Sequence, residues 1–260
     1  TSIEVLENIN FKMAVDSFTL EIENAVVGSG SQNALNQCYK YGREDFCAKV
    51  SRSYGGDVNS VEYGYINSES MDRFRGVDYS VNMTFEDLSL IGGSLEVDVI
   101  GTHFKENVTV DASGVSDDYV GACYDLGESC FNRDRITLSL RYYKNDWRIG
   151  LTTRFLSGID TSQTVKDYFA EPPYGSALPD GWQQEVFDIY SVPDYHISNL
   201  NIGYSFTEHY NMNLTISNLF DRDPPYYKDF FGFVDPQINT PQNTYDVVGR
   251  YFQVGFKLTY

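Results

Sequence analysis

The four cysteines are the residues whose spacing most directly suggests chemistry. They form two close pairs, Cys38 with Cys47 and Cys123 with Cys130, and each pair lies in a polar, turn-rich stretch. Neither pair has the CxxC spacing or the nearby histidine of a zinc site. The pattern favours two local disulfides in an oxidising compartment, and the alternative is four free thiols in a reducing cytosol.

Catalytic motifs do not accompany the cysteines. The sequence contains no GxSxG, no HExxH and no phosphate-binding glycine loop, and its three histidines are scattered. Two acidic pairs, Asp117 with Asp118 and Asp221 with Asp223, could bind calcium, but they lack EF-hand spacing and are typical of solvated loops. We therefore expect no enzymatic activity, no resident metal and no cofactor.

Composition narrows the class of protein further. The chain has 260 residues, with 19 Lys and Arg against 37 Asp and Glu, and its net charge of −18 disfavours binding to nucleic acid. Aromatic residues make up 15% of the chain, which favours β structure over disorder. We expect neither a transmembrane helix nor a signal peptide, because no long apolar run is present and the first residues, TSIEVLENIN, are polar.

The elements that would carry these residues repeat with a period of two. In GVDYSVNMTF, from Gly76 to Phe85, apolar and polar residues alternate along the chain. The same alternation predicts eight antiparallel strands, at residues 11–27, 61–85, 94–104, 134–143, 147–156, 196–206, 211–220 and 247–260. No segment shows a convincing helical stripe of apolar residues.

The connections between these strands are of two kinds. Short turns are expected at residues 86–93, 143–146 and 207–211, and long polar loops at about 28–58, 105–133, 157–194 and 221–246. A meander with short turns at one end and long loops at the other is typical of an antiparallel transmembrane β-barrel. There the apolar face meets lipid and the polar face lines the lumen. We therefore predict an all-β chain that forms such a barrel or a portion of one.

Four stretches of the sequence resemble TonB-dependent outer-membrane receptors. The last stretch contains SNLFDRDPPYY and YDVVGRY, which resemble the last external loop and the last strand of that family. NQCYKYGREDFCAKV and GACYDLGESCFNRDR resemble its external loops with paired cysteines, and YINSESMDRFRGVDYSVNMTF resembles its long strand. The four stretches follow the order of the family and extend over nearly the whole chain.

The resemblance implies that residues 1–260 are the C-terminal part of a 22-stranded receptor barrel, about its last eight strands. The N-terminal plug and the earlier strands would be absent from this chain. The implied location is the bacterial outer membrane. The implied partners are outer-membrane lipid, the remainder of the barrel and plug, TonB acting through the missing N-terminal part, and the outer-membrane assembly machinery.

The function implied by the resemblance is TonB-energised uptake of a scarce nutrient of the oligosaccharide, siderophore or corrinoid class. Two alternatives remain open on the residues alone. The same barrel could serve as a passive outer-membrane channel, or the chain could be a soluble secreted glycan-binding β module. A soluble module would purify without detergent, which distinguishes it from the other two.

The final eight residues fit the polar-x-Gly-x-x-apolar-x-apolar pattern, which resembles the signal read by the assembly machinery. Its determinants here would be Gln253, Gly255, Phe256, Leu258 and Tyr260. A closing strand must present an edge that can pair and an aromatic residue at its lipid-facing end.

If the resemblance holds, ligand is captured by the long external loops. Two of these loops, 157–194 and 221–246, are rich in aromatic residues, which offer stacking surfaces beside polar groups. The acidity of the loops disfavours a strongly anionic ligand unless basic groups come from elsewhere. The predicted ligand contacts are Tyr168, Phe169, Tyr174, Trp182, Tyr226 and Tyr227.

Overall fold

A computed structural model shows the fold as two compact units. It describes residues 2–6, 8–62, 64–67, 71–88, 91–110, 116–124, 129–160, 191–226, 240 and 244–259. Unit 1 comprises Thr1–Thr19, Phe74–Asn107 and Asp118–Tyr260, and unit 2 comprises Leu20–Arg73 and Val108–Asp117. The two units are described separately below.

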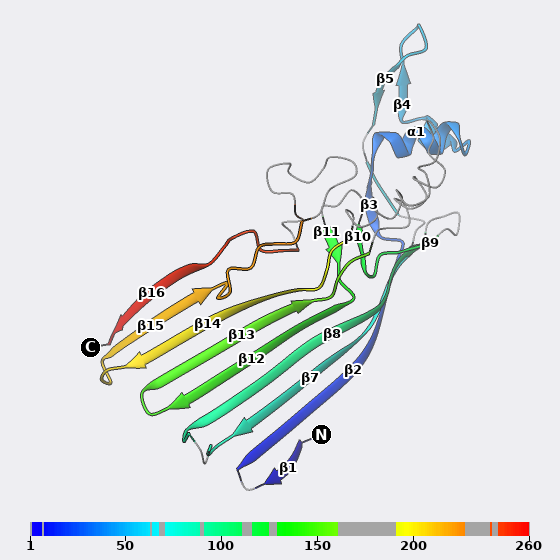
Figure 1. The fold of residues 1–260 in the computed structure, drawn as a ribbon. Helices are drawn as coiled ribbons and strands as arrows, with labels where there is room; N and C mark the ends of the chain where they lie inside the picture. Colours follow the sequence, from blue (N-terminus) through cyan, green and yellow to red (C-terminus); the bar gives the residue numbers. More distant parts are fainter. Residues whose placement is uncertain are drawn as a thin grey trace, which may run out of the picture. The chain divides into compact units, whose positions relative to one another are not determined.

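Most of the described chain forms one antiparallel sheet (Figure 1). Among the described residues its order is β1-β2-β7-β8-β12-β13-β14-β15-β16, and β9 pairs with β8. The strands are β1 (Ser2–Leu6), β2 (Ile9–Glu23), β7 (Met71–Phe85), β8 (Ser94–Val110), β9 (Ser116–Asp118), β12 (Asp134–Lys144), β13 (Trp147–Leu156), β14 (Tyr195–Ser205), β15 (Tyr210–Ser217) and β16 (Tyr251–Leu258). From β7 onward the long strands of this order follow one another along the chain, as in a meander.

The register of the sheet separates an apolar face from a polar face. One row of directly opposed residues crosses six strands and is wholly apolar: Val97, Leu140, Leu151, Leu200, Ile216 and Phe252. The next row is polar apart from one glycine: Glu96, Arg141, Gly150, Asn201, Thr215 and Gln253. Because successive side chains of a strand point to opposite sides, the two rows define the two faces.

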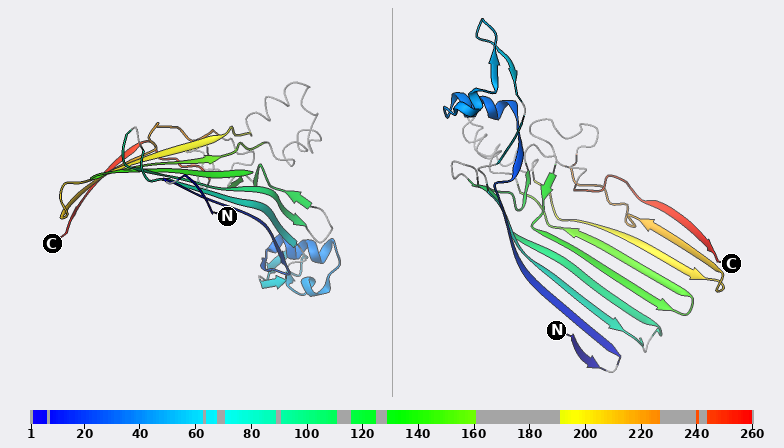
Figure 2. Two further views of the ribbon diagram at one scale, coloured as in Figure 1. Left: turned by 90° about the horizontal axis from the view of Figure 1, so that it is seen from below. Right: turned by 180° about the vertical axis from the view of Figure 1, so that it is seen from behind.

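The two ends of the sheet differ in their connections. The turns β7–β8, β12–β13 and β14–β15 are short and define what we call the turn end. The opposite end, where β8, β13 and β15 finish and β12, β14 and β16 begin, is called the loop end (Figure 2). A small hairpin of β10 (Ala122–Tyr124) and β11 (Ser129–Phe131) precedes β12 at the loop end.

Unit 2 contains the helices of the described chain. They are α1 (Ser31–Tyr39) and α2 (Glu44–Cys47). Two short antiparallel pairs accompany them, β3 (Val26–Ser29) with β6 (Gly64–Asn67) and β4 (Val50–Arg52) with β5 (Val58–Val61). The predicted loop 28–58 therefore contains helices α1 and α2 and strand β4.

Helix α1 was not expected from the sequence, and its packing explains why. Ala34 and Cys38, one turn apart, are its buried residues, and they pack against Phe46 of α2. The remaining positions are mostly polar, so the helix has no broad apolar stripe. A disulfide from Cys38 to Cys47 joins α1 to the end of α2 and supplies the stability that apolar burial does not.

The eight predicted strands correspond to β2, β7, β8 and β12 to β16, but their bounds differ in places. The first strand ends at Glu23, because Asn24 has a φ of 54°, a left-handed conformation that interrupts an extended chain. The predicted strand 61–85 divides into the end of β5, β6 and β7. Strand β8 continues to Val110, whereas a loop was predicted from residue 105.

Helices that could cross a membrane are absent from the described residues, since none there is both long and apolar enough.

Candidate functional site

A buried apolar cluster lies at the loop end of the polar face. Leu156 and Tyr195 are opposed in register on this face, and Leu156 also faces Arg135. The ring of Tyr245, from the segment before β16, meets Tyr195 edge to face at a centroid distance of 5.3 Å. The cluster consists of Cys130, Leu156, Ile159, Val192, Tyr195, Ile197 and Tyr245. It therefore joins strands β13 and β14 to segments that are distant in sequence.

Backbone and side-chain hydrogen bonds hold this cluster in place. Asn132 Nδ2 donates to the carbonyl oxygen of Ser157 at 2.7 Å and to Tyr245 Oη at 3.2 Å. The backbone amide of Cys130 donates to Thr244 Oγ1 at 3.1 Å. Burial raises the pKa of the Tyr245 hydroxyl above its ordinary value, so the group stays protonated and neutral at physiological pH.

The base of the loop that follows β13 closes on the same cluster. Ile159 and Val192 form an isolated antiparallel bridge, with both backbone amides donating across it at 2.8 Å. Residues 161–190, which lie between the two bridging residues in sequence, are outside the described part of the chain. The bridge brings the two ends of that loop to the loop end of the sheet, beside Tyr195.

A cavity of about 530 Å³ opens beside the cluster on the polar face. It is lined by the apolar residues Phe131 and Leu156 and by the basic residues Arg135 and Arg154. The Arg135 guanidinium lies over the ring of Phe131, 4.8 Å from its centroid, and over that of Phe104 at 5.5 Å. A cavity with a ring, an aliphatic wall and two cations can bind a small molecule that is part apolar and part polar.

Toward the turn end, the polar face is crossed by paired charges. Arg141 Nε donates to Glu96 at 2.9 Å, and its Nη2 contacts Asp98. Asn82 Nδ2 donates to Asp98 Oδ1 at 2.6 Å. These contacts link β7, β8 and β12 on one side of the sheet. The charges neutralise one another, so this part of the face is a polar wall rather than a reactive centre.

The two parts of the SNLFD and YD…GR motif meet in space. Asn218 has a φ of 50°, and its Oδ1 accepts a hydrogen bond from the Arg222 amide at 2.8 Å. Asp221, with a φ of 53°, accepts from the backbone amide of Arg250 at 2.8 Å, and the two side chains form an ion pair at 3.7 Å. The motif therefore has a structural role, in which the turn after β15 positions the start of β16.

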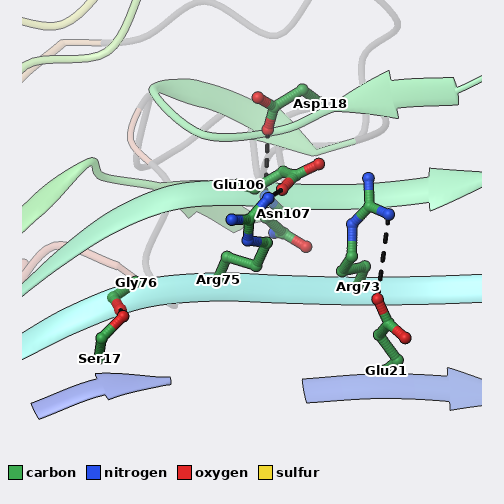
Figure 3. A network of polar contacts seen from close by, with 8 residues as sticks. All are labelled: Ser17, Glu21, Arg73, Arg75, Gly76, Glu106, Asn107 and Asp118. Carbon is green, nitrogen blue, oxygen red and sulfur yellow. Dashed lines mark hydrogen bonds and ion pairs between the residues drawn. The ribbon is translucent and has the colours of Figure 1, made fainter. Parts of the chain in front are cut away.

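Near the loop end of β2, β7 and β8, cross-strand ion pairs support the strands (Figure 3). Arg75 Nη1 lies 3.1 Å from Glu106 Oε2, and Arg73 Nη1 lies 3.9 Å from Glu21 Oε1. All four side chains keep substantial solvent exposure, so each pair contributes no more than about 1 kcal/mol.

Asp118, one of the acidic residues considered for calcium, has a local role. Its Oδ1 accepts hydrogen bonds from the backbone amides of Asn107 at 3.2 Å and Val120 at 3.0 Å (Figure 3 shows the first). In the described part of the chain, no three His, Cys, Asp or Glu residues gather as metal ligands would.

The cysteines lie in the two predicted places. Cys38 and Cys47, nine residues apart, form a disulfide. Cys130 is also disulfide-bonded, and its register partner in the β10–β11 hairpin is Cys123. The side chain of Cys123 lies outside the described part, so its pairing with Cys130 stays a prediction.

The predicted ligand contacts lie mostly outside the described residues. Tyr226 is described, and its side chain is 59% exposed in the segment that follows β15. The others, which the structure does not describe, are Tyr168, Phe169, Tyr174, Trp182 and Tyr227. The role of these rings stays a prediction.

The predicted assembly signal lies on β16, the last strand. Phe256 is opposed to Met212 and Leu258 to Tyr210 on the apolar face, whereas Gln253 lies on the polar face. A Cβ added at Gly255 would meet only Asn213, at an ordinary distance of 4.0 Å, so local packing does not demand glycine there. Tyr260 lies outside the described residues, and the signal itself stays a prediction.

The fold and its two faces define an antiparallel β-sheet of the outer-membrane barrel class. The family model described as "TonB dependent receptor-like, beta-barrel" matches residues 3–219. The chain therefore belongs to the TonB-dependent receptor family, and it is a fragment of the receptor barrel located in the bacterial outer membrane.

Solved receptor structures share this fold. A mutant of the ferric enterobactin receptor from Pseudomonas aeruginosa has 14% identity and a TM-score of 0.54, over 98% of this chain and 29% of its own. The ferripyoverdine receptor of the same organism has 15% identity and a TM-score of 0.46, over 98% of this chain and 25% of its own. The FrpB iron transporter from Neisseria meningitidis has 12% identity and a TM-score of 0.47, over 97% of this chain and 29% of its own.

The likeness to the ferric enterobactin receptor concerns the fold alone, because the identity is below 25%. The chain spans about a quarter to three tenths of the receptors that it matches. No curated protein sequence matches it significantly.

Sequence reasoning missed the residues that form the cavity and the cluster. Tyr245 was noted as part of a motif, but Asn132, Arg135, Arg154 and Tyr195 were not singled out. The alternation along β12 and β13 does place both arginines on the polar face. What the alternation could not show is which residues of neighbouring strands are opposed, because that depends on the register.

Proposed function

We propose that this chain is the C-terminal part of the barrel of an outer-membrane receptor, which takes up a scarce nutrient with energy supplied through TonB. The nutrient belongs to the oligosaccharide, siderophore or corrinoid class. The observation that carries the proposal is the pair of adjacent rows, one apolar and one polar, that crosses six strands in register. A wall between lipid and an aqueous lumen needs this arrangement.

The apolar face has the features of a surface in contact with lipid. Val254 and Phe256 are 51% and 80% exposed, and a soluble sheet would bury such residues beneath another layer. Near the turn end, the rings of Trp147 and Tyr204 are tilted against each other with centroids 4.6 Å apart, and the rings of Tyr204 and Phe206 meet edge to face at a centroid distance of 4.8 Å. Aromatic residues gather at the membrane–water interfaces of β-barrels. These features support lipid as a partner and argue against a soluble glycan-binding module.

The edges of the sheet support a larger barrel. At one edge, β1 pairs antiparallel with β2 through Ile3 and Phe11, as the end of a preceding strand would. At the other edge, β16 pairs with β15 alone within the described chain. Unpaired strand edges inside a membrane are costly, so both edges need further strands. We propose that the remaining strands continue from these edges and that the plug lies against the polar face.

Uptake by the complete receptor tests the proposal. Cells that express the receptor as their only route for a labelled nutrient should accumulate it, and deletion of TonB should abolish the accumulation. A panel of oligosaccharides, ferric siderophores and cobalamin would identify the class. If accumulation persisted without TonB, the passive-channel alternative would replace active import.

The aromatic loops can be tested with the same receptor. Changing Trp182 and Tyr226 together to alanine should weaken binding of the transported nutrient at least tenfold, because each ring offers a stacking surface. Trp147→Ala is the control, since Trp147 lies at the turn end of the apolar face. Unchanged affinity in the double variant would remove these loops from the binding site.

A further inference from the structure

Two arginines on the polar face differ from the other arginines of the sheet. Arg141 is paired with Glu96 and Asp98, and Arg75 is paired with Glu106. Across the described residues, Arg135 and Arg154 have no carboxylate partner and donate no hydrogen bond. A chain with 37 acidic residues has no shortage of carboxylates, so the missing partner is a property of this place.

The register brings these two arginines together. Thr137 is opposed to Arg154, and Arg135 is opposed to Leu156, so the arginines are diagonal neighbours on the same face of β12 and β13. Diagonal neighbours of this kind have Cα atoms roughly 7–8 Å apart. Two positive charges at this spacing repel one another.

The described surroundings of the two arginines do not neutralise them. Arg135 is positioned by the rings of Phe104 and Phe131, which attract a cation without cancelling its charge. Both arginines line the cavity of about 530 Å³, whose volume falls within the range of small-molecule sites. The repulsion would be relieved by an anion placed between the two groups.

We propose that this cavity is an anion-binding subsite, in which Arg135 and Arg154 hold a carboxylate or phosphate group of the transported ligand. Guanidinium groups bind such oxygens through paired, charge-assisted hydrogen bonds. The Phe131 ring and Leu156 form a wall for the less polar body of the same molecule. The inference rests on the proposed receptor function and narrows its substrate to a small molecule with an anionic group.

The subsite also changes the expectation drawn from the acidic loops. A strongly anionic ligand was disfavoured there unless basic groups came from elsewhere, and these two arginines are such groups. They lie on strands of the barrel wall, where backbone pairing fixes their positions. A site on paired strands needs little reorganisation to bind.

Binding of simple anions to the purified complete receptor tests the subsite. Citrate and inorganic phosphate serve as the carboxylate and phosphate probes in calorimetric titrations, and uncharged xylitol serves as the neutral probe. Arg135→Gln and Arg154→Gln should each weaken anion binding by about 10- to 100-fold, because a charged hydrogen-bonding partner is removed. Arg148→Gln is the matched control, since Arg148 lies on the same face but donates to Ser205 and Asn211.

Crystals of the complete receptor soaked in selenate add a direct readout. A selenium peak should lie between the two guanidinium groups and disappear in the double variant. If a selenium peak appeared but neither arginine variant changed the anion affinity in the titrations, the peak would indicate an adventitious ion only, and the proposal would be overturned. Equal binding of xylitol, or a carboxylate of the plug already seated between the arginines, would overturn it as well. TonB-dependent uptake that continued in any of these cases would leave the receptor function intact.

Discussion

Asn132 Nδ2 donates a hydrogen bond to Tyr245 Oη at 3.2 Å, and 113 residues separate the two in sequence. Asn132 precedes β12, and Tyr245 precedes β16. The contact therefore joins the entries of two strands that are not neighbours in the sheet. Because Tyr245 also packs on Tyr195, it ties the segment before the last strand to the loop end of the polar face.

Removing this contact should destabilise the receptor in two steps. Tyr245→Phe deletes only the hydroxyl and should lower the free energy of unfolding by about 1 kcal/mol. Tyr245→Ala also empties a fully buried ring site and should cost about 3–5 kcal/mol. Urea unfolding of the receptor in lipid vesicles measures both, with Tyr54→Phe, at an exposed position, as the control. Equal effects of Tyr245→Phe and Tyr54→Phe would show that the hydrogen bond contributes nothing.

The assignment of faces predicts an asymmetry between two adjacent residues of β16. Val254 is opposed to Leu214 on the apolar face, and Gln253 is opposed to Thr215 on the polar face. Val254→Arg should cost about 2–4 kcal/mol, because it places a charge in lipid near the middle of the strand. Gln253→Arg should cost much less. Folding into vesicles at graded urea measures the difference, and equal costs would show that the faces are assigned wrongly.

Two glycines of the sheet, Gly101 on β8 and Gly150 on β13, should respond oppositely to alanine. A Cβ at Gly101 would overlap the ring of Tyr79, whereas one at Gly150 would meet its nearest atoms at 3.9 Å. Gly101→Ala should therefore destabilise the sheet by about 1–3 kcal/mol. Gly150→Ala should be neutral or slightly stabilising, since glycine costs conformational entropy in a strand. The two variants can be compared by heating the receptor in detergent and recording the temperature at which the compact folded band is lost on a gel. If Gly101→Ala left that temperature unchanged, the Tyr79 ring would have to move aside freely.

The contact between Asp221 and Arg250 should depend on an acceptor oxygen more than on charge. Asp221→Asn keeps an oxygen for the Arg250 amide and a residue that tolerates a positive φ, so it should cost at most about 1 kcal/mol. Asp221→Ala loses the acceptor at the same left-handed position and should cost about 1–3 kcal/mol more. Thermal unfolding of the purified receptor compares them. If the two variants were equally destabilised, the ion pair would be the dominant contribution.

The disulfides should act locally. Cys38 and Cys47 close a loop across nine positions, so their bond should contribute roughly 2–3 kcal/mol by restricting the unfolded chain. Replacing both with serine should speed proteolysis within 31–62 and leave cleavage of the strand region unchanged. Non-reducing peptide mapping should find Cys38 joined to Cys47 and Cys123 to Cys130. Four alkylatable thiols would contradict the prediction.

The sequence alone determined the strands and their faces, because the alternation of side chains is a local property of an extended chain. The rows through Leu140 and Arg141 follow the alternation read from the residues. Motif resemblance likewise identified the family, since SNLFD and YD…GR are contiguous in sequence. Even so, the motif did not show that Asp221 and Arg250 contact each other, which required the turn after β15 to be folded.

Tertiary structure decided what depends on register and on distant packing. The pairing of β12 and β13 sets Thr137 opposite Arg154, and the cavity that the two arginines line also needs Thr244, which lies far outside this hairpin in sequence. Helix α1 exists because a disulfide and Phe46 complete its small core, although its own sequence is mostly polar. Periodicity within one segment shows the faces of that segment but not the residues that pack against them, so the folded structure was needed to reveal these partners.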